Sequence, residues 1–128
     1  MVRALSLRQP WAELILQGKK TIETRNWNTS YRGKFYVHAA KVVNELACRN
    51  FGIDPQKVIR GSIVGFATLV AVKRYETVKE WNADEKKHFA GSSSYHCPKY
   101  GFILRDIHRI KPIPFKGKLN FFPINIDR

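Results

Sequence analysis

The chain contains the segment Lys20-Thr21-Ile22-Glu23-Thr24-Arg25, in which three of six side chains ionise and only Ile22 is apolar. Lysine and glutamate are weak strand formers, so packing alone does not account for this composition. In an extended strand, Thr21, Glu23 and Arg25 share one face, with Glu23 and Arg25 about 6.6–7 Å apart. Lys20 is out of phase with them, at the turn that precedes the strand. Two interpretations follow: a polar ligand-binding strand, or a solvated edge strand with an ion pair on one face.

Short strands and short helices are predicted on both sides of this segment. Pro10 suits the first turn of a helix, and Gly18 can end that helix in the left-handed conformation. Residues 33–39 alternate, with Phe35, Val37 and Ala39 on one face and His38 on the polar face. The predicted strands are 2–7, 20–25, 33–39, 62–72, 100–105 and 119–126. The predicted helices are 10–18, 43–51 and 55–61, followed by a helical, lysine-rich insertion at 77–91. The apolar stripe of 43–51 is Val43, Leu46, Ala47 and Phe51, and Thr77-x-x-Glu80 and Asn82-x-x-Glu85 are capping-box patterns that frame the insertion.

The strand predicted at 62–72 is hydrophobic on both faces, which is typical of a strand buried on both sides. Gly65 within it predicts a bend. Short strands with few helices indicate an α+β fold, built as a small mixed β-barrel with short covering helices. At 128 residues, the sequence fits one domain spanning 1–128.

The sequence is strongly basic, with 23 Lys and Arg against 10 Asp and Glu and a formal net charge of +13. Basic residues recur along the chain and are not confined to a tail, so a folded basic surface with a polyanionic partner is expected. The alternative is a lysine-rich surface that serves solubility alone. Two unrelated cysteines and no long apolar run indicate a reducing compartment, with a cytoplasmic protein that does not enter the membrane.

Aromatic residues flank the polar segment. Trp11 opens the preceding helix, and Trp27 and Tyr31 follow the strand. Aromatic rings beside Lys and Arg can stack an unpaired base while the cations hold phosphate. Trp11 lies on the apolar stripe of its helix and is also a core candidate, whereas Trp27 lies in a polar loop and suggests a surface role.

The pattern Gly18-x-Lys20-x-x-Glu23-x-Arg25 resembles the hallmark of the ASCH family, which is PUA-like. The lead-in Leu5-Ser6-Leu7-Arg8-Gln9-Pro10-Trp11-Ala12 and the follow-on Tyr31-Arg32-Gly33 and Val37-His38-Ala39 are similar to an EOLA-like branch of that family. The resemblance implies a PUA-like fold and a cleft beside the first helix that binds RNA. The candidate ligand-binding residues are Gln9, Trp11, Lys20, Glu23, Arg25, Trp27, Tyr31, Arg32 and His38.

The same resemblance implies an enzymatic alternative. Some bacterial members are amidohydrolases that cleave N4-acetylcytidine, and others are reported as ribonucleases. The amidohydrolases carry a threonine nucleophile where this chain has Glu23, so Lys20 and Glu23 are the catalytic candidates if the protein is an enzyme. Desolvation beside Arg25 would lower the pKa of Lys20 and allow it to act as a base. Neutralisation by Glu23 would leave a site that only binds.

Other signals are weaker. His88, His96 and Cys97 lack a fourth ligand, so no metal and no other cofactor are predicted. His38 could reach the cleft or satisfy a structural contact. The expected partner is RNA or a modified nucleoside, with DNA as a second polyanion, and the chain is expected to be a monomer. A protein-interaction adaptor remains a third hypothesis.

Overall fold

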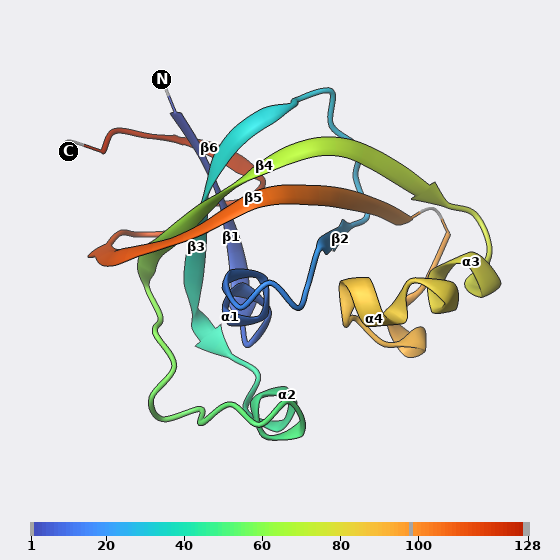
Figure 1. The fold of residues 1–128 in the computed structure, drawn as a ribbon, viewed down its shortest axis with the longest axis horizontal. Helices are drawn as coiled ribbons and strands as arrows, with labels where there is room; N and C mark the ends of the chain where they lie inside the picture. Colours follow the sequence, from blue (N-terminus) through green and yellow to red (C-terminus); the bar gives the residue numbers. More distant parts are fainter. Residues whose placement is uncertain (1, 98, 127–128) are drawn as a thin grey trace.

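Six strands form one mixed sheet in the computed structural model, which describes residues 2–97 and 99–126 (Figure 1). The strand order is β2-β5-β4-β3-β1-β6; β1 and β3 pair parallel and the other neighbours pair antiparallel. The strands are β1 Val2–Gln9, β2 Ile22–Arg25, β3 Gly33–Val43, β4 Ser62–Tyr75, β5 Lys99–Pro114 and β6 Phe121–Ile124. The helices are α1 Trp11–Leu16, α2 Glu45–Asn50, α3 Val78–Ala83 and α4 Glu85–His88, with a 3₁₀ turn η1 at Ser92–Ser94.

The α+β class is confirmed, but the expected closed barrel is not. Within the described residues the hydrogen-bonded order ends at β2 on one side and β6 on the other, so the sheet is curved and open. Both end strands are only four residues long. In the described residues, no backbone pairing joins these two end strands.

The curvature comes from the two longest strands, β4 and β5, whose register shifts at three points. Each irregularity adds a bend and increases the local twist. Gly65 lies at one of these points, and a Cβ there would approach within 2.4 Å of the His108 carbonyl oxygen. The bend predicted at Gly65 is therefore confirmed, and its cause is the close approach of β5.

The core lies on one face of the curved sheet and beneath α1. A larger cluster includes Leu5, Phe35, Leu69 and Phe102, all almost fully buried. A smaller cluster around Ile63 and Phe122 lies near β6. The predicted alternation of 33–39 holds for the apolar face, although His38 on the other face is also buried.

Several local predictions were wrong, and each error has a local cause. β3 continues to Val43 and Asn44 caps α2, so the predicted apolar stripe is out of phase and Leu46 is 68% exposed. The helix predicted at 55–61 is a single turn, in which the Lys57 and Val58 amides both donate to the Asp54 carbonyl oxygen.

The lysine-rich insertion after β4 is helical, as predicted, and forms two short helices, α3 and α4. The predicted Thr77 cap is confirmed, since its hydroxyl accepts from the Glu80 amide at 3.1 Å. The second predicted cap, at Asn82, is not formed; Asp84 precedes α4. Asp84 accepts from the Tyr75 hydroxyl at 2.6 Å, which fixes the insertion to the end of β4.

The last two strands also differ from prediction. β5 begins at Lys99 and runs to Pro114, well past the predicted end at 105. The last strand is limited to Phe121–Ile124, and Leu119 is 90% exposed. In the described ranges no helix is long and apolar enough to cross a bilayer.

Candidate functional site

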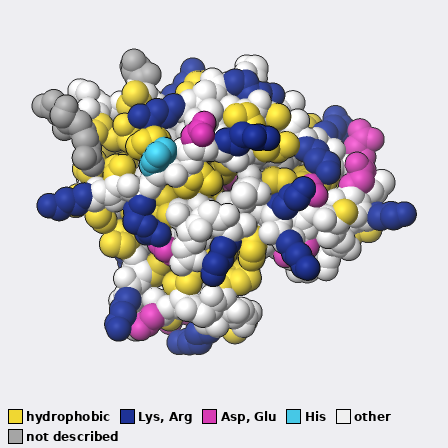
Figure 2. All heavy atoms as spheres, viewed as in Figure 1, with side chains coloured by type: hydrophobic (Ala, Val, Ile, Leu, Met, Phe, Trp, Pro, Cys, Tyr) yellow, Lys and Arg dark blue, Asp and Glu magenta, His cyan; other side chains and the backbone are white. Residues whose placement is uncertain are grey.

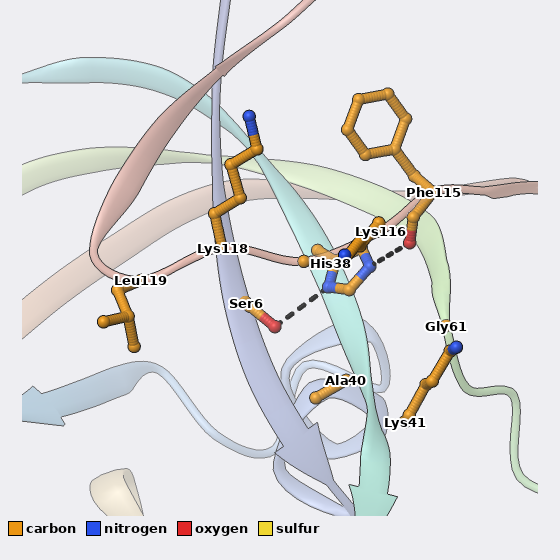
Figure 3. Close-up of a pocket in the computed structure, with 10 residues that line it drawn as sticks. Ser6, His38, Ala40, Lys41, Gly61, Phe115, Lys116, Lys118 and Leu119 are labelled. Atoms are coloured by element: carbon orange, nitrogen blue, oxygen red, sulfur yellow. Dashed lines mark hydrogen bonds between the residues drawn. The ribbon is translucent and has the colours of Figure 1, made fainter.

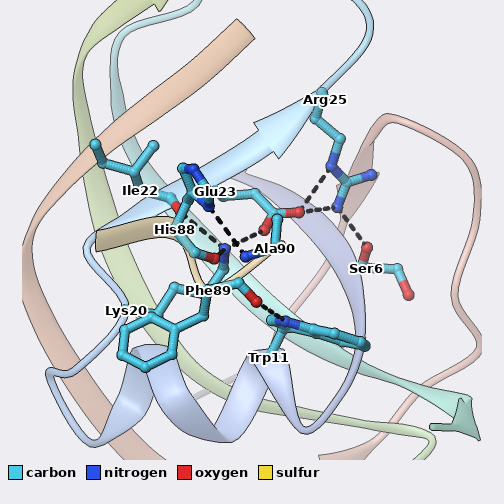
Figure 4. Close-up of polar contacts among 9 residues, drawn as sticks. All are labelled: Ser6, Trp11, Lys20, Ile22, Glu23, Arg25, His88, Phe89 and Ala90. Atoms are coloured by element: carbon cyan, nitrogen blue, oxygen red, sulfur yellow. Dashed lines mark hydrogen bonds and ion pairs between the residues drawn. The ribbon is translucent and has the colours of Figure 1, made fainter. Parts of the chain in front are cut away.

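Lys20, Glu23 and Arg25 come together in one cluster, called here the ion trio (Figure 4). Glu23 lies between the two cations. Its Oε1 is 3.3 Å from Lys20 Nζ, and its Oε2 is 2.8 Å from Arg25 Nη2 and accepts from Arg25 Nε at 2.9 Å. One carboxylate therefore balances two cations, and the trio keeps a net charge of +1.

Lys20 is the most enclosed member of the trio, with 1% of its side chain exposed. Besides Glu23, its ammonium donates to the carbonyl oxygens of Ile22, at 2.7 Å, and His88. An ammonium has three N–H donors, and here each has an acceptor. Burial lowers the pKa of Lys20, and Glu23 opposes that shift. A neutral amine would leave one of three buried acceptors without a donor, so the geometry favours the charged form and an anchoring role.

Burial alone would raise the pKa of the Glu23 carboxyl, but Arg25 and Lys20 outweigh it and hold that pKa below the ordinary value. Glu23 is therefore ionised at neutral pH. With both oxygens engaged by cations, it is poorly suited to take up a proton from a substrate.

The residues around the trio also hold the end of the helical insertion. Three successive carbonyl oxygens of the insertion accept hydrogen bonds from groups within 11–21. The Lys87 carbonyl oxygen accepts from the Thr21 amide at 2.9 Å, and the His88 carbonyl oxygen accepts from Lys20 Nζ. The Phe89 carbonyl oxygen accepts from Trp11 Nε1 at 2.9 Å. Trp11 is half-buried, and its indole N–H is taken by this contact. Its position fits an anchor for α4 better than a freely exposed stacking surface.

Arg25 joins the two sides of the open sheet. β2 lies at one end of the strand order and β1 next to the other, yet Arg25 Nη2 donates to the Ser6 carbonyl oxygen at 2.9 Å. β6 pairs with Val2–Leu5 of β1, so Ser6 lies one residue beyond that pairing. A side chain thus spans the gap that backbone pairing leaves, while 20% of the Arg25 side chain remains exposed.

Strand pairing places an aromatic ring between two arginines at the edge of the core. Tyr100 of β5 lies opposite Arg25 in β2 and opposite Arg74 in β4. Directly paired residues share a face of the sheet, so the three form a row, called here the Arg25–Tyr100–Arg74 row. The Arg74 guanidinium carbon is 5.9 Å from the Tyr100 ring centroid.

Lys99 adds a further cation beside this row. Burial lowers the pKa of Lys99. The negative charge of Glu23 raises that pKa, and the positive charge of Arg25 lowers it. Sequence reasoning did not select Arg74, Lys99 and Tyr100 as candidates, because only the register of three strands brings them next to Arg25. The adjacent Lys99-Tyr100 pair, a cation beside an aromatic residue, was the available signal.

The remaining aromatic candidates pack on one another. Trp27 meets Phe102 and Phe121 edge-on, with ring centroids 5.3 and 6.0 Å apart. Tyr31 packs against Phe121 at 5.4 Å, and the Arg3 guanidinium lies 4.4 Å over its ring. Both rings are half-buried at the margin of the core, which accounts for much of their surface.

Arg32 and Gln9 are held by backbone groups outside the ion trio. Arg32 is exposed and donates to the Thr29 and Tyr31 carbonyl oxygens. Gln9 is buried; its amide donates to the Ile59 carbonyl oxygen at 2.7 Å and accepts from the Glu13 amide at 2.9 Å. These two hydrogen bonds fix the first turn of α1, so the position of Gln9 is explained by its structural contacts and requires no ligand.

His38 is buried and lines a separate cavity of about 390 Å³ together with Ser6 (Figure 3). It is 2.9 Å from the Ser6 hydroxyl through Nδ1 and 2.6 Å from the Phe115 carbonyl oxygen through Nε2. His38 therefore does not contact the ion trio directly. Ser6 connects the two regions, because its carbonyl oxygen contacts Arg25 and its hydroxyl contacts His38.

No group of three His, Cys, Asp or Glu side chains in the described part of the chain could hold a metal ion. His88 is buried against Trp81, with ring centroids 4.1 Å apart. Its Nδ1 accepts from the Ala90 amide, so Nε2 carries the proton toward the Trp81 carbonyl oxygen. Burial lowers the pKa of His88, in agreement with a neutral structural ring.

The ASCH domain model matches residues 5–111. The fold is similar to the crystal structure of ASCH from Zymomonas mobilis, at 20% identity and a TM-score of 0.72, covering 96% of this chain and 87% of that one. A single-substitution variant of the same protein matches at 21% identity and a TM-score of 0.71, with the same coverage. These likenesses support the predicted PUA-like arrangement, with an open sheet in place of a closed barrel.

A short stretch also matches activating signal cointegrator 1 from Mus musculus and from Homo sapiens. Each match is 46% identical over 35 residues, which is 27% of this chain. The matched stretch is only 6% of the length of either relative.

Proposed function

This chain belongs to the ASCH domain family, and from that premise we propose that it binds single-stranded RNA, or a nucleotide carrying a modified base, at the Arg25–Tyr100–Arg74 row. The carrying observation is the position of Arg25. Glu23 and the Ser6 carbonyl oxygen fix its guanidinium, β2 pairs Arg25 with Tyr100 of β5, and part of the Arg25 side chain stays accessible. Arg25 is the contact residue in this proposal, and Lys20 and Glu23 position it.

The chemistry of the row suits an unpaired nucleotide. An aromatic ring can stack on a base, and the arginines on either side can donate to its phosphates or to the base edge. Lys99 lies next to Tyr100 and adds charge at the same place. Because a stacked base needs an exposed ring face, single-stranded RNA is favoured over a duplex.

The surrounding charge supports a polyanionic ligand. Figure 2 shows Lys and Arg side chains spread over the viewed face, with fewer Asp and Glu among them. The formal net charge is +13, and the ion trio contributes one uncancelled positive charge at the row. A surface of this kind raises the rate and affinity with which a polyanion binds.

Hydrolysis of an acylated base or cleavage of RNA is less well supported by the same geometry. Lys20 has an acceptor for each of its three donors, and Glu23 has a cation at each oxygen. Neither group is free to move a proton without breaking the trio. Recognition of a ligand by Arg25 requires no such change.

The test is the affinity of a fluorescently labelled single-stranded RNA, measured by anisotropy at several salt concentrations. Arg25→Gln should weaken binding by about 1–3 kcal/mol, the range for one lost base or phosphate contact. It should also reduce the slope of log affinity against log salt by about one if Arg25 contacts phosphate. Retained affinity in Arg25→Gln would contradict the proposal.

The chain offers a matched control for the second arginine of the row. Arg74 and Arg49 are both exposed, and each pairs with one glutamate, Arg74 with Glu76 and Arg49 with Glu45. Arg74→Gln should weaken RNA binding more than Arg49→Gln does. Equal losses would indicate a general charge effect, and indifference of all variants to RNA would favour a protein-interaction adaptor. Single-stranded DNA of the same sequence serves as the competing polyanion.

A further inference from the structure

The second region of interest is the cavity that His38 lines, between β1, β3 and the segment 115–119 that follows β5 (Figure 3). Three lysines line it, Lys41, Lys116 and Lys118, and all three are exposed residues. No Asp or Glu lines the cavity, and within 2–97 and 99–126 no acidic side chain pairs with these lysines. Among the described residues, the cavity lining therefore carries three positive charges without an acidic partner.

The inner surface of the cavity is fixed by hydrogen bonds. A carbonyl oxygen can only accept, so His38 Nε2 carries the proton that it shares with Phe115. In the neutral imidazole, Nδ1 then accepts from the Ser6 hydroxyl. Both polar side chains at the base of the cavity are thus held in place without any ligand.

The segment over the cavity is also held in place. The Phe115 amide donates to the Gly61 carbonyl oxygen at 3.0 Å. At Gly117 a Cβ would lie 2.7 Å from His38 Cε1 and 3.0 Å from the Ser6 hydroxyl oxygen. Glycine at this position lets the backbone between Lys116 and Lys118 pass directly over the His38–Ser6 pair, so the shape of the cavity depends on it.

The lining also has an apolar part that the fold does not use. Leu119 borders the cavity and is 90% exposed, although its sequence neighbours Phe121 and Phe122 enter the core. Binding pockets for small molecules commonly measure about 300–1,000 Å³ and combine apolar walls with a few polar groups. A cavity of about 390 Å³ with lysines and an exposed leucine meets that description.

We infer that this cavity binds a phosphomonoester carried on a sugar and heterocycle, with the positive charges of Lys41, Lys116 and Lys118 attracting the phosphate and Leu119 covering the apolar part. Ligands of this chemistry are a free nucleoside monophosphate and the phosphorylated end of an RNA strand. The site is distinct from the Arg25–Tyr100–Arg74 row and does not depend on it. Ser6 contacts both regions, through different atoms.

The first test is calorimetric titration of the full chain with the four nucleoside 5′-monophosphates, the matching nucleosides, and inorganic phosphate. A monophosphate should bind at least about tenfold more tightly than its nucleoside, since charge-assisted contacts to phosphate are lost in the latter. It should also bind more tightly than inorganic phosphate, which lacks the apolar part. Equal affinity for monophosphate and nucleoside would overturn the proposal.

Charge reversal of the lining supplies a matched pair of variants. Lys116→Glu with Lys118→Glu should weaken monophosphate binding at least about tenfold. Lys79→Glu with Lys86→Glu changes the net charge equally at exposed positions in α3 and α4, and should have a much smaller effect. Equal losses in the two double variants would overturn the assignment to the cavity, and Leu119→Ser should reduce affinity without changing the charge.

Two further measurements separate the ligand sources and the two proposals. If the source is a strand end, a 5′-phosphorylated RNA oligonucleotide should outcompete its 5′-hydroxyl counterpart; if it is a free nucleotide, only the monophosphate should compete. Arg25→Gln should leave monophosphate affinity unchanged. Two independent sites are supported if Arg25→Gln loses binding of 5′-hydroxyl RNA but keeps monophosphate binding, and if the Lys116→Glu, Lys118→Glu variant shows the reverse. Loss of monophosphate affinity in Arg25→Gln would contradict them.

Discussion

The ion trio and the lysine-lined cavity use positive charge in opposite ways. Lys20 is enclosed, and each of its donors has a fixed acceptor, whereas Lys41, Lys116 and Lys118 are exposed around an open cavity. Burying ions is costly unless they are paired and hydrogen-bonded, so the fold depends on keeping all three members of the trio in contact. Exposed lysines cost the fold little and remain available to a ligand. The difference teaches that a residue of the sequence motif, such as Lys20, can stabilise the fold, while lysines outside the motif carry the accessible charge.

The strongest test of this contrast is Lys20→Met, which should lower the free energy of unfolding by about 3–5 kcal/mol, as when one partner of a buried ion pair is removed. The substitution leaves the Ile22 and His88 carbonyl oxygens without their donor. Urea denaturation measures the effect, and Lys19→Met, at the exposed neighbouring position, is the control. A Lys20→Met protein as stable as Lys19→Met would mean that the trio does not anchor the fold.

A smaller effect, about 2–3 kcal/mol at neutral pH, is expected for Glu23→Gln, because Arg25 is partly exposed and can be solvated. The direction in which the free energy of unfolding changes with pH follows from the lowered pKa of Glu23. As pH falls below the ordinary value of 4.5, the unfolded chain takes up a proton before the folded one, and stability is lost until pH passes the folded pKa.

Glu23→Gln cannot make that transition, so its stability should fall less steeply on acidification and the two proteins should converge at low pH. Thermal unfolding between pH 7 and pH 3 measures the convergence. Parallel curves for the two proteins would show that Glu23 is not the group responsible.

The smallest change is expected at the cavity. Lys116→Glu with Lys118→Glu should alter the free energy of unfolding by no more than about 0.5 kcal/mol, as is usual for exposed positions. The same double variant is expected to lose nucleotide affinity, so substitution at the cavity should change binding with little change in the free energy of unfolding. A large loss of stability would remove the contrast with the trio.

Periodicity and residue type were enough to predict the strands near 2–7, 33–39 and 62–72, the turn at Gly18 and the cap at Thr77. Each of these depends on residues close in sequence. The convergence of Lys20, Glu23 and Arg25 was also anticipated, since they fall within one short segment. What the sequence did not reveal was that Lys20 would be almost fully buried.

Features that depend on pairing between distant strands could not be predicted in this way. The Arg25–Tyr100–Arg74 row requires the register of β2, β5 and β4, and β5 has irregularities that no local pattern indicates. The cavity joins residues from β1 and β3 to a segment more than seventy residues later. The stripe assigned to 43–51 failed because β3 continued into it and moved the helix start.

The three successive carbonyl oxygens of Lys87, His88 and Phe89 have a mechanical consequence. Each is bonded to a different group in the segment 11–21, one from a backbone amide, one from a lysine and one from an indole. The helical insertion is therefore attached to the segment 11–21 by three hydrogen bonds. Detaching it requires all three bonds to break, and this removes one acceptor from the Lys20 ammonium. Lys20 contacts Glu23, and Glu23 contacts Arg25, so a continuous series of polar contacts connects the insertion to the Arg25 guanidinium.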